Sequence, residues 1–230
     1  MIDDWASYRV ADFVPFTAEV YFRLIERAGE SFWPLHLLTV ATGLVALILA
    51  LRGRGRVAAL LLAVVWAWVG ITFLMQRYTQ LNWAGEYFGW GFLVQAALLA
   101  LIALTGLGLT GPGRPPGVPG WVGLALAVTG LLLYPIIAPL TGHGGFQAET
   151  FGIHPDPTVV ATLGIGLLML DGAWRWLAFI VPYLWCLISA LTLQVLNVPW
   201  VLVLYAVIVV AVLAMVWQSM ANVVRVRMSN

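Results

Sequence analysis

The residues best suited to bind a ligand gather in two short polar segments and near the N-terminus. They include all three histidines of the chain, His36, His143 and His154, together with Glu149 and Asp156. Histidine and carboxylate side chains are good ligands for zinc, copper, nickel or iron. These five residues predict a divalent transition metal site. His143 and His154 are eleven positions apart, however, which matches no compact metal motif, so a hydrated or hydrogen-bonded polar rim is the simpler alternative.

A second set of polar residues is suited to contact a small solute or ion. They come from the N-terminal region and from segments 76–87 and 141–157, which we expect on one face of the protein. The predicted ligand-binding residues are Arg23, Arg27, Arg77, Tyr78, Glu86 and Gln147.

Several kinds of chemistry are not indicated. The chain carries no nucleophile elbow, P-loop, dinucleotide fingerprint or paired-carboxylate motif, so an enzyme is the less favoured class. It contains no lysine, which excludes a retinal Schiff base, and its single cysteine, Cys186, cannot form an internal disulfide. No clustered basic face is present, and we therefore expect no nucleic acid partner.

Composition determines the fold class. Of the 230 residues, 62% are hydrophobic and 9% are charged, whereas soluble domains carry roughly 25% charged residues. The apolar residues form solid runs of Leu, Val, Ala and Ile rather than alternating with polar ones, which favours helices over a β-barrel. We therefore predict an all-α integral membrane protein in contact with the lipid bilayer.

We predict about seven transmembrane helices in one bundle over residues 35–220. An N-terminal segment, 1–34, precedes them and a cytoplasmic tail, 221–230, follows. Within the first segment, residues 17–30 read as an amphipathic helix lying in the membrane interface, with Val20, Tyr21, Leu24 and Ile25 on its apolar face. The predicted spans are 35–51, 57–75, 88–110, 121–140, 157–172, 175–196 and 199–219.

The fifth span, 157–172, is the least regular of the seven. Its apolar part is about 20 Å long as a helix, so a re-entrant segment is the alternative to a full crossing. Asp171 and Arg175 follow it one helical turn apart. We interpret them as a charge pair that snorkels to water at a tight turn, with a gate or proton site as the alternative.

Uncharged polar residues within the spans favour hydrogen bonds between helices over a ligand pocket. The residues concerned are Gln95, Tyr134, Tyr183, Ser189, Thr192, Gln194 and Tyr205.

The arginines predict the orientation. Seven of them, Arg52, Arg54, Arg56, Arg114, Arg175, Arg225 and Arg227, share one side of a seven-span arrangement. We assign that side to the cytoplasm, which places the N-terminus outside and the C-terminus inside. Since the N-terminus lacks the features of a secretory signal, we expect the first span to direct insertion.

Two stretches resemble an uncharacterised prokaryotic membrane-protein family, the domain of unknown function 6064 family. The first runs from Trp5 to Phe13 and continues with Tyr21-Phe22-Arg23-Leu24 and Trp33-Pro34-Leu35. The second is Phe151-Gly152-Ile153-His154-Pro155-Asp156-Pro157-Thr158 with Thr162-Leu163-Gly164. The resemblance covers nearly the whole chain. It implies a small multi-span protein of a prokaryotic cytoplasmic (inner) membrane, with no established activity and no catalytic residues.

Three functions follow from these features. The first is the binding or transport of a small solute or ion through the outer face. The second is a structural subunit, in a homo-oligomer or a larger membrane complex, which the charge-free spans and the small-residue pairs Gly106/Gly108 and Gly164/Gly166 would suit. The third is a metal-binding protein or metalloenzyme at the outer face.

Overall fold

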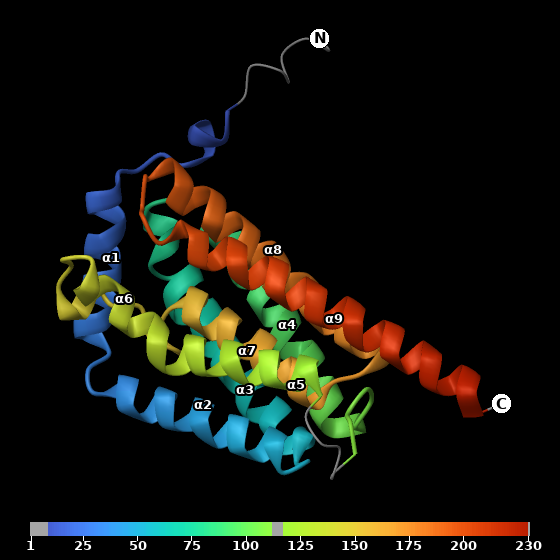
Figure 1. Cartoon of the computed structure of the whole chain (residues 1–230). Coiled ribbons are helices and arrows are strands. Elements are labelled where there is room, and N and C mark those ends of the chain that lie inside the picture. Colours follow the sequence, from blue (N-terminus) through green and yellow to red (C-terminus); the bar gives the residue numbers. More distant parts are fainter. Residues whose placement is uncertain (1–8, 112–116, 230) are drawn as a thin grey trace, which may run out of the picture.

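The computed structural model describes residues 9–111 and 117–229, with side chains to residue 221 (Figure 1). The chain is about 80% helical, and the described residues contain no β-strand. The α-helices are α1 (Ala18–Ser31), α2 (Leu35–Leu51), α3 (Gly55–Val69), α4 (Gly85–Thr105), α5 (Val118–Val128), α6 (Tyr134–Leu140), α7 (Pro155–Met169), α8 (Gly172–Val195) and α9 (Val201–Ser229). Short helical turns extend or link them: η2 (Val10–Phe13), η3 (Gly70–Met75), η4 (Tyr78–Gln80), η5 (Thr129–Leu133) and η6 (Gly145–Gln147).

Among the residues that the structure describes, five helices are long and apolar enough to cross a membrane: Gly55–Gln80, Gly85–Thr105, Val118–Leu140, Gly172–Val195 and Val201–Ala221. A sixth is counted if the bent pair Val10–Ser31 and Leu35–Leu51 forms one span. The predicted number of seven is therefore not confirmed. Each of the seven predicted spans is helical, but α7 has 15 residues and reaches only about 22 Å, less than the roughly 30 Å of a hydrocarbon core.

Helix α7 lies in the middle of the bundle (Figure 1), where α2, α3, α5, α8 and α9 all contact it. Every residue of α7 except Leu168 is buried. Glycines allow this enclosure, because a Cβ on Gly164 would lie only 2.5 Å from the Gly123 carbonyl oxygen of α5. The helix α7 is thus surrounded by protein on all sides.

Helix α1 lies across the ends of the other helices and meets α2 at an angle of 89° (Figure 1). Thr17 caps it by accepting a hydrogen bond from the Val20 backbone. Its inner face buries Tyr21, Phe22, Leu24, Ile25, Ala28 and Gly29. The amphipathic helix predicted over 17–30 is present, but Val20 is 43% exposed and does not belong to the apolar face. We call the end of the bundle covered by α1 the α1 end.

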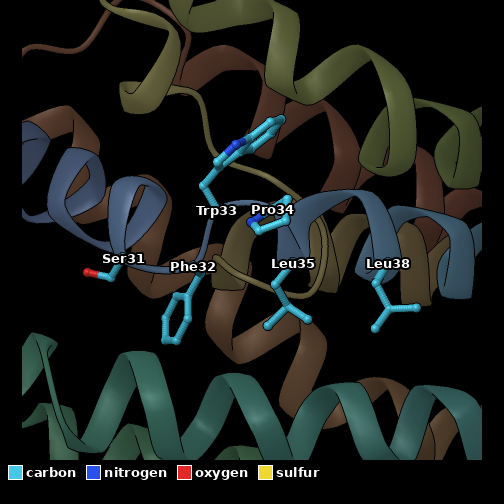
Figure 2. A pocket seen from close by; sticks show the side chains of 6 residues that line it. All are labelled: Ser31, Phe32, Trp33, Pro34, Leu35 and Leu38. Carbon is cyan, nitrogen blue, oxygen red and sulfur yellow. The ribbon is translucent and has the colours of Figure 1, made fainter.

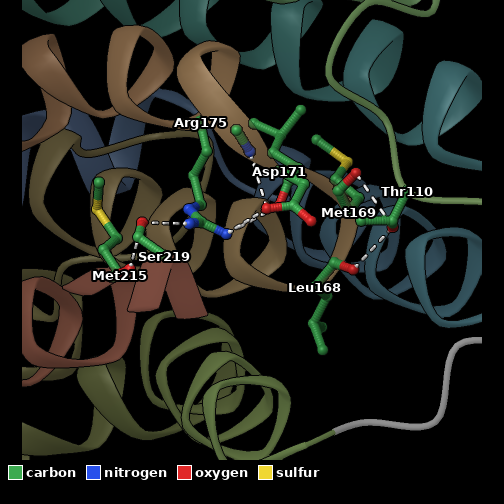
Figure 3. Close-up of polar contacts among 9 residues, drawn as sticks. Thr110, Leu168, Met169, Asp171, Arg175, Met215 and Ser219 are labelled. Atoms are coloured by element: carbon green, nitrogen blue, oxygen red, sulfur yellow. Dashed lines mark hydrogen bonds and ion pairs between the residues drawn. The ribbon is translucent and has the colours of Figure 1, made fainter. Parts of the chain in front are cut away.

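At the opposite end, Arg175 links three helices (Figure 3). Its guanidinium donates to Asp171 Oδ1 at 3.3 Å, to the Leu170 carbonyl at 3.4 Å and to Ser219 of α9 at 3.2 Å. The predicted pair with Asp171 therefore exists, but the Arg175 side chain is 0% exposed and does not snorkel to water. The reason is that α9 closes over it, which the sequence pattern did not indicate.

The structure describes only some of the arginines that predict the orientation. Arg52, Arg54 and Arg56 are exposed at the end opposite α1. Arg114 and the side chains of Arg225 and Arg227 lie outside the described residues. Residues 221–229, predicted as a tail, continue the helix α9.

Candidate functional site

The segment between α6 and α7 turns inward beneath α1. His154 ends this turn, and its ring Nδ1 accepts a hydrogen bond from the Thr150 backbone at 3.0 Å. Gly152 has φ +75°, and a Cβ there would lie 2.7 Å from the Thr39 side chain of α2, so a larger residue does not fit. Its backbone N–H donates to Thr158 Oγ1 at 2.8 Å. This turn directs two carboxylates, Glu149 before it and Asp156 after it, into the protein.

Asp156 is 1% exposed and lies in the first turn of α7. Its carboxylate accepts three hydrogen bonds: from Trp185 Nε1 and Ser189 Oγ of α8, both at 2.7 Å, and from the Tyr134 hydroxyl of α6 at 3.1 Å. The N-terminus of a helix also favours negative charge. Asp156 is therefore held by neutral groups from two neighbouring helices.

Glu149 is 4% exposed. Its Oε1 accepts a long hydrogen bond, 3.5 Å, from the Tyr21 hydroxyl of α1. Its Oε2 has no hydrogen-bond partner among the described residues. Burial raises the pKa of the Glu149 carboxyl well above its ordinary value, and the negative charge of nearby Asp156 raises this pKa further. One oxygen of this carboxylate is consequently free to accept a ligand or a proton.

Neither of these two carboxylates has a positively charged partner among the residues that the structure describes. Within the described residues, ion pairs join Arg23 to Glu19 and Arg175 to Asp171, and none involves Glu149 or Asp156. His154 does not supply a charge near neutral pH, because burial lowers its pKa to about 3. Two acidic groups enclosed together without a cation are unfavourable. A bound proton or a cation would reduce this cost.

The six predicted ligand-binding residues are not gathered in one place. Arg23 and Arg27 are exposed on α1, and Glu86 is exposed on the first turn of α4. Arg77 donates to the Thr72 carbonyl at 2.6 Å and lies 4.2 Å above the Phe32 ring. Gln147 donates to Glu26 of α1 at 3.4 Å. Tyr78 is the only one of the six that is buried, and it lies within electrostatic range of Asp156.

The five predicted metal ligands likewise do not converge. In the part of the chain that the structure describes, no three His, Cys, Asp or Glu side chains form a group that could hold a metal ion. His143 packs against the Phe22 and Trp200 rings, with centroids 4.5 and 5.2 Å away. Both ring nitrogens of His154 face backbone groups. Glu149 and Asp156 are the two members that come together.

Sequence reasoning missed the neutral partners of the carboxylates. Tyr134 of α6 and Ser189 of α8 join helices as predicted, because both donate to Asp156 of α7, but the sequence does not indicate that they share this carboxylate. Other residues of the set also join helices: Gln95 donates to the Ala178 carbonyl of α8 at 2.9 Å, and Tyr205 donates to Gln194 at 2.5 Å. The available signal for the site was an acidic residue, Asp156, at the start of an otherwise uncharged apolar run.

Two surface hollows lie near the N-terminal part of the described chain. One lies at the α1–α2 corner, has a volume of about 420 Å³ and is lined by Ser31, Phe32, Trp33, Pro34, Leu35 and Leu38. Figure 2 shows that its lining is almost entirely apolar. The other, about 470 Å³, lies between the N-terminal segment and the ends of α4 and α8. Only the second borders a residue, Tyr78, that lies near the carboxylates.

The buried Glu149 carboxyl predicts a pH dependence of stability. Its pKa is raised in the folded protein above the ordinary value of 4.5, so the folded state retains a proton that the unfolded chain loses. This stabilisation is complete below the ordinary pKa and is lost as pH rises through the folded pKa. Within that window each pH unit changes the free energy of unfolding by up to about 1.4 kcal/mol.

Thermal unfolding in detergent of the wild type and Glu149→Gln, from about pH 5 to about pH 8, measures this effect. The melting temperature of Glu149→Gln minus that of the wild type should increase as pH rises. His154 works in the opposite direction, losing stability as pH falls from 6.5 toward about 3, but it is common to both proteins and cancels. The exposed Glu19→Gln is the control, and a difference for Glu149→Gln that stays constant with pH would contradict the prediction.

The apolar helices around these buried polar groups define a multi-pass α-helical membrane protein. The chain belongs to the DUF6064 family, a family of unknown function whose sequence model matches residues 18–225. This finding confirms the resemblance seen in the sequence. No curated protein and no solved structure matches the chain.

Proposed function

We propose that this membrane protein binds a small cation at Glu149 and Asp156, beneath α1. The observation that carries the proposal is the Glu149 Oε2 atom, which is buried without a hydrogen-bond partner among the described residues. It belongs to one of two carboxylates that form no ion pair with an arginine in the described part of the chain. A cation placed there would complete the hydrogen bonding of Glu149 and neutralise the enclosed negative charge.

The neutral donors around Asp156 support a role in ligand binding rather than in stability alone. Three hydrogen bonds from Tyr134, Trp185 and Ser189 hold its carboxylate in position. Glu149, by contrast, has only the long bond from Tyr21. Asp156 would thus form a fixed wall of the site, and Glu149 would be the group that exchanges its partner.

Helix α1 would control access. Three polar contacts hold α1 over the site. The Tyr21 hydroxyl donates to Glu149, and the Ile25 carbonyl lies 3.4 Å from His154 Nε2. Glu26 accepts a hydrogen bond from Gln147. These are long, weak contacts. We propose that the α1 end faces the outside, in keeping with the arginines at the opposite end, and that α1 admits the cation from there for binding or transport.

Cation binding tests this function directly. Protein in lipid nanodiscs would be equilibrated with carbon-14 methylammonium or with sodium-22, for the wild type, Glu149→Gln and Asp156→Asn. We expect saturable binding of at least one cation to the wild type and a loss of about tenfold or more in affinity for Glu149→Gln, since a charged group contributes about 1.5–3 kcal/mol to such a bond.

The matched controls are Glu19→Gln and Glu86→Gln, which remove the same charge from exposed positions. Both should bind as the wild type does. If neither cation binds the wild type, or if Glu149→Gln binds equally well, the proposal fails. Uptake into proteoliposomes of any cation that binds then separates transport from binding alone.

The rival proposal of a structural subunit has lost part of its support. The glycines suggested as contacts for a partner pack within the chain: Gly164 against α5, Gly166 against Phe179, Gly106 against Arg56 and Gly108 against Trp174. Purification in mild detergent tests the rival, because a subunit should bring partner proteins in fixed ratio.

A further inference from the structure

A pocket of about 470 Å³ lies beside the buried carboxylates at the α1 end. Its walls come from the N-terminal segment around Phe13, the loop before α4 and the last turns of α8. Asn82 donates from its side chain to the Phe13 carbonyl at 2.9 Å and so holds the N-terminal segment over the pocket. Pockets for small organic ligands have volumes of roughly 300–1,000 Å³.

The chemistry of the pocket is aromatic and acidic. Tyr78, Trp83 and Phe88 contribute three rings to its lining, and Asp12 is the only charged residue among the described residues that line it. The faces of aromatic rings attract cations, with Trp the strongest. An organic cation is the ligand class that combines an apolar body for such walls with a positive charge for acidic groups.

Two chains of contacts connect this pocket to Asp156. Phe88 packs edge-on against Trp185, with ring centroids 5.6 Å apart, and Trp185 donates to Asp156 at 2.7 Å. Tyr78 lies within electrostatic range of Asp156 and is in polar contact with Thr192, which also lines the pocket. Phe88 with Trp185 on one side and Tyr78 on the other therefore connect the pocket to the carboxylate.

We propose that this pocket receives an organic ammonium ion, whose apolar body lies against Trp83 and Phe88 and whose charged nitrogen is directed past Tyr78 toward Asp156 and Glu149. The inference rests on the proposed cation binding at these carboxylates and names the substrate class. A bare metal ion would gain little from a pocket with such apolar walls. A neutral lipid chain would gain nothing from the acidic groups at both ends.

Phenethylammonium and phenethyl alcohol form a matched pair of probes, since they share the aromatic arm and differ in charge. Equilibrium binding to nanodisc-embedded protein should favour phenethylammonium by about tenfold or more, through the rings and the charge-assisted hydrogen bonds of the carboxylates.

Ala84 lines the pocket, so Ala84→Phe should fill it and abolish phenethylammonium binding. Ala173→Phe, at an exposed position of α8 at the opposite end, should bind normally.

Methylammonium, which lacks the aromatic arm, separates this inference from the proposed function. We expect it to bind Ala84→Phe as it binds the wild type, which also shows that the variant is folded. Equal affinity for phenethylammonium and phenethyl alcohol, or undiminished binding to Ala84→Phe, would overturn the pocket assignment. If methylammonium binds in a Glu149-dependent way but phenethylammonium does not bind, the pocket assignment is overturned and the proposed cation site is retained. Binding of neither ammonium ion nor of sodium would defeat both.

Discussion

Gly164→Ala is expected to destabilise the protein by about 3 kcal/mol, because it adds a methyl group where two helices touch. A Cβ at this position would lie 2.5 Å from the Gly123 carbonyl oxygen and 2.7 Å from Ala127 Cα. These are backbone atoms of α5 and cannot move aside as a flexible side chain can. The helices must therefore separate, and the enclosed packing of α7 is lost along with their contact.

Gly91→Ala is the matched control for this prediction. It makes the same substitution in a helix, α4, at a position where a Cβ would meet nothing within 4 Å. Since alanine is the better helix former, the control should be neutral or slightly stabilising. Unfolding in detergent followed by tryptophan fluorescence measures both variants. Equal stability of Gly164→Ala and Gly91→Ala would show that the close approach of α5 and α7 does not limit the fold.

Asp171→Ala is expected to cost about 2–3 kcal/mol, because it removes a negative charge from beside the buried Arg175 guanidinium. Breaking a fully buried pair costs about 3–5 kcal/mol, and we reduce this value because the Asp171 side chain is 25% exposed. The carbonyl of Leu170 and the hydroxyl of Ser219 remain as partners of Arg175 in the variant.

The double variant Asp171→Ala/Arg175→Met is the decisive control. Methionine replaces most of the arginine volume with an apolar chain that needs no counter-charge, so the double variant should recover most of the lost stability. Unfolding of both variants in detergent provides the comparison. Additive losses in the double variant would indicate that Arg175 stabilises the protein by packing rather than through its charge.

Much of the helical architecture could be predicted from the sequence. Apolar runs locate a helix at each of the predicted spans, and the predicted break between spans 175–196 and 199–219 agrees with the end of α8 at Val195 and the start of α9 at Val201. The number of crossings could not be predicted from the sequence. Hydropathy indicates that a helix has apolar surroundings, but it does not tell whether these surroundings are lipid or protein. The apolar run of α7 satisfies the pattern of a span, yet its side chains face other helices.

The candidate site was only partly predictable for a related reason. The sequence identifies Glu149 and Asp156 as ligand candidates, but groups them with the three histidines in a metal site or, alternatively, a polar rim. Their burial depends on the turn at Gly152 and on α1 folding across the bundle end through an 89° corner, and both are tertiary features. The donors Trp185 and Ser189 lie some thirty positions further along the chain, so no local spacing connects them to Asp156.

The enclosure of α7 has a consequence for how the protein is made. Helices that enter a membrane singly must be stable in lipid before they meet their neighbours. An isolated α7 would be too short for the hydrocarbon core and would carry Asp156 into it. During synthesis, α2 to α5 are available before α7 emerges, whereas Trp185, Ser189 and Ser219 follow it. The earlier helices must therefore shelter α7 until α8 and α9 arrive to complete its surroundings, so that insertion and tertiary folding of this segment form a single step.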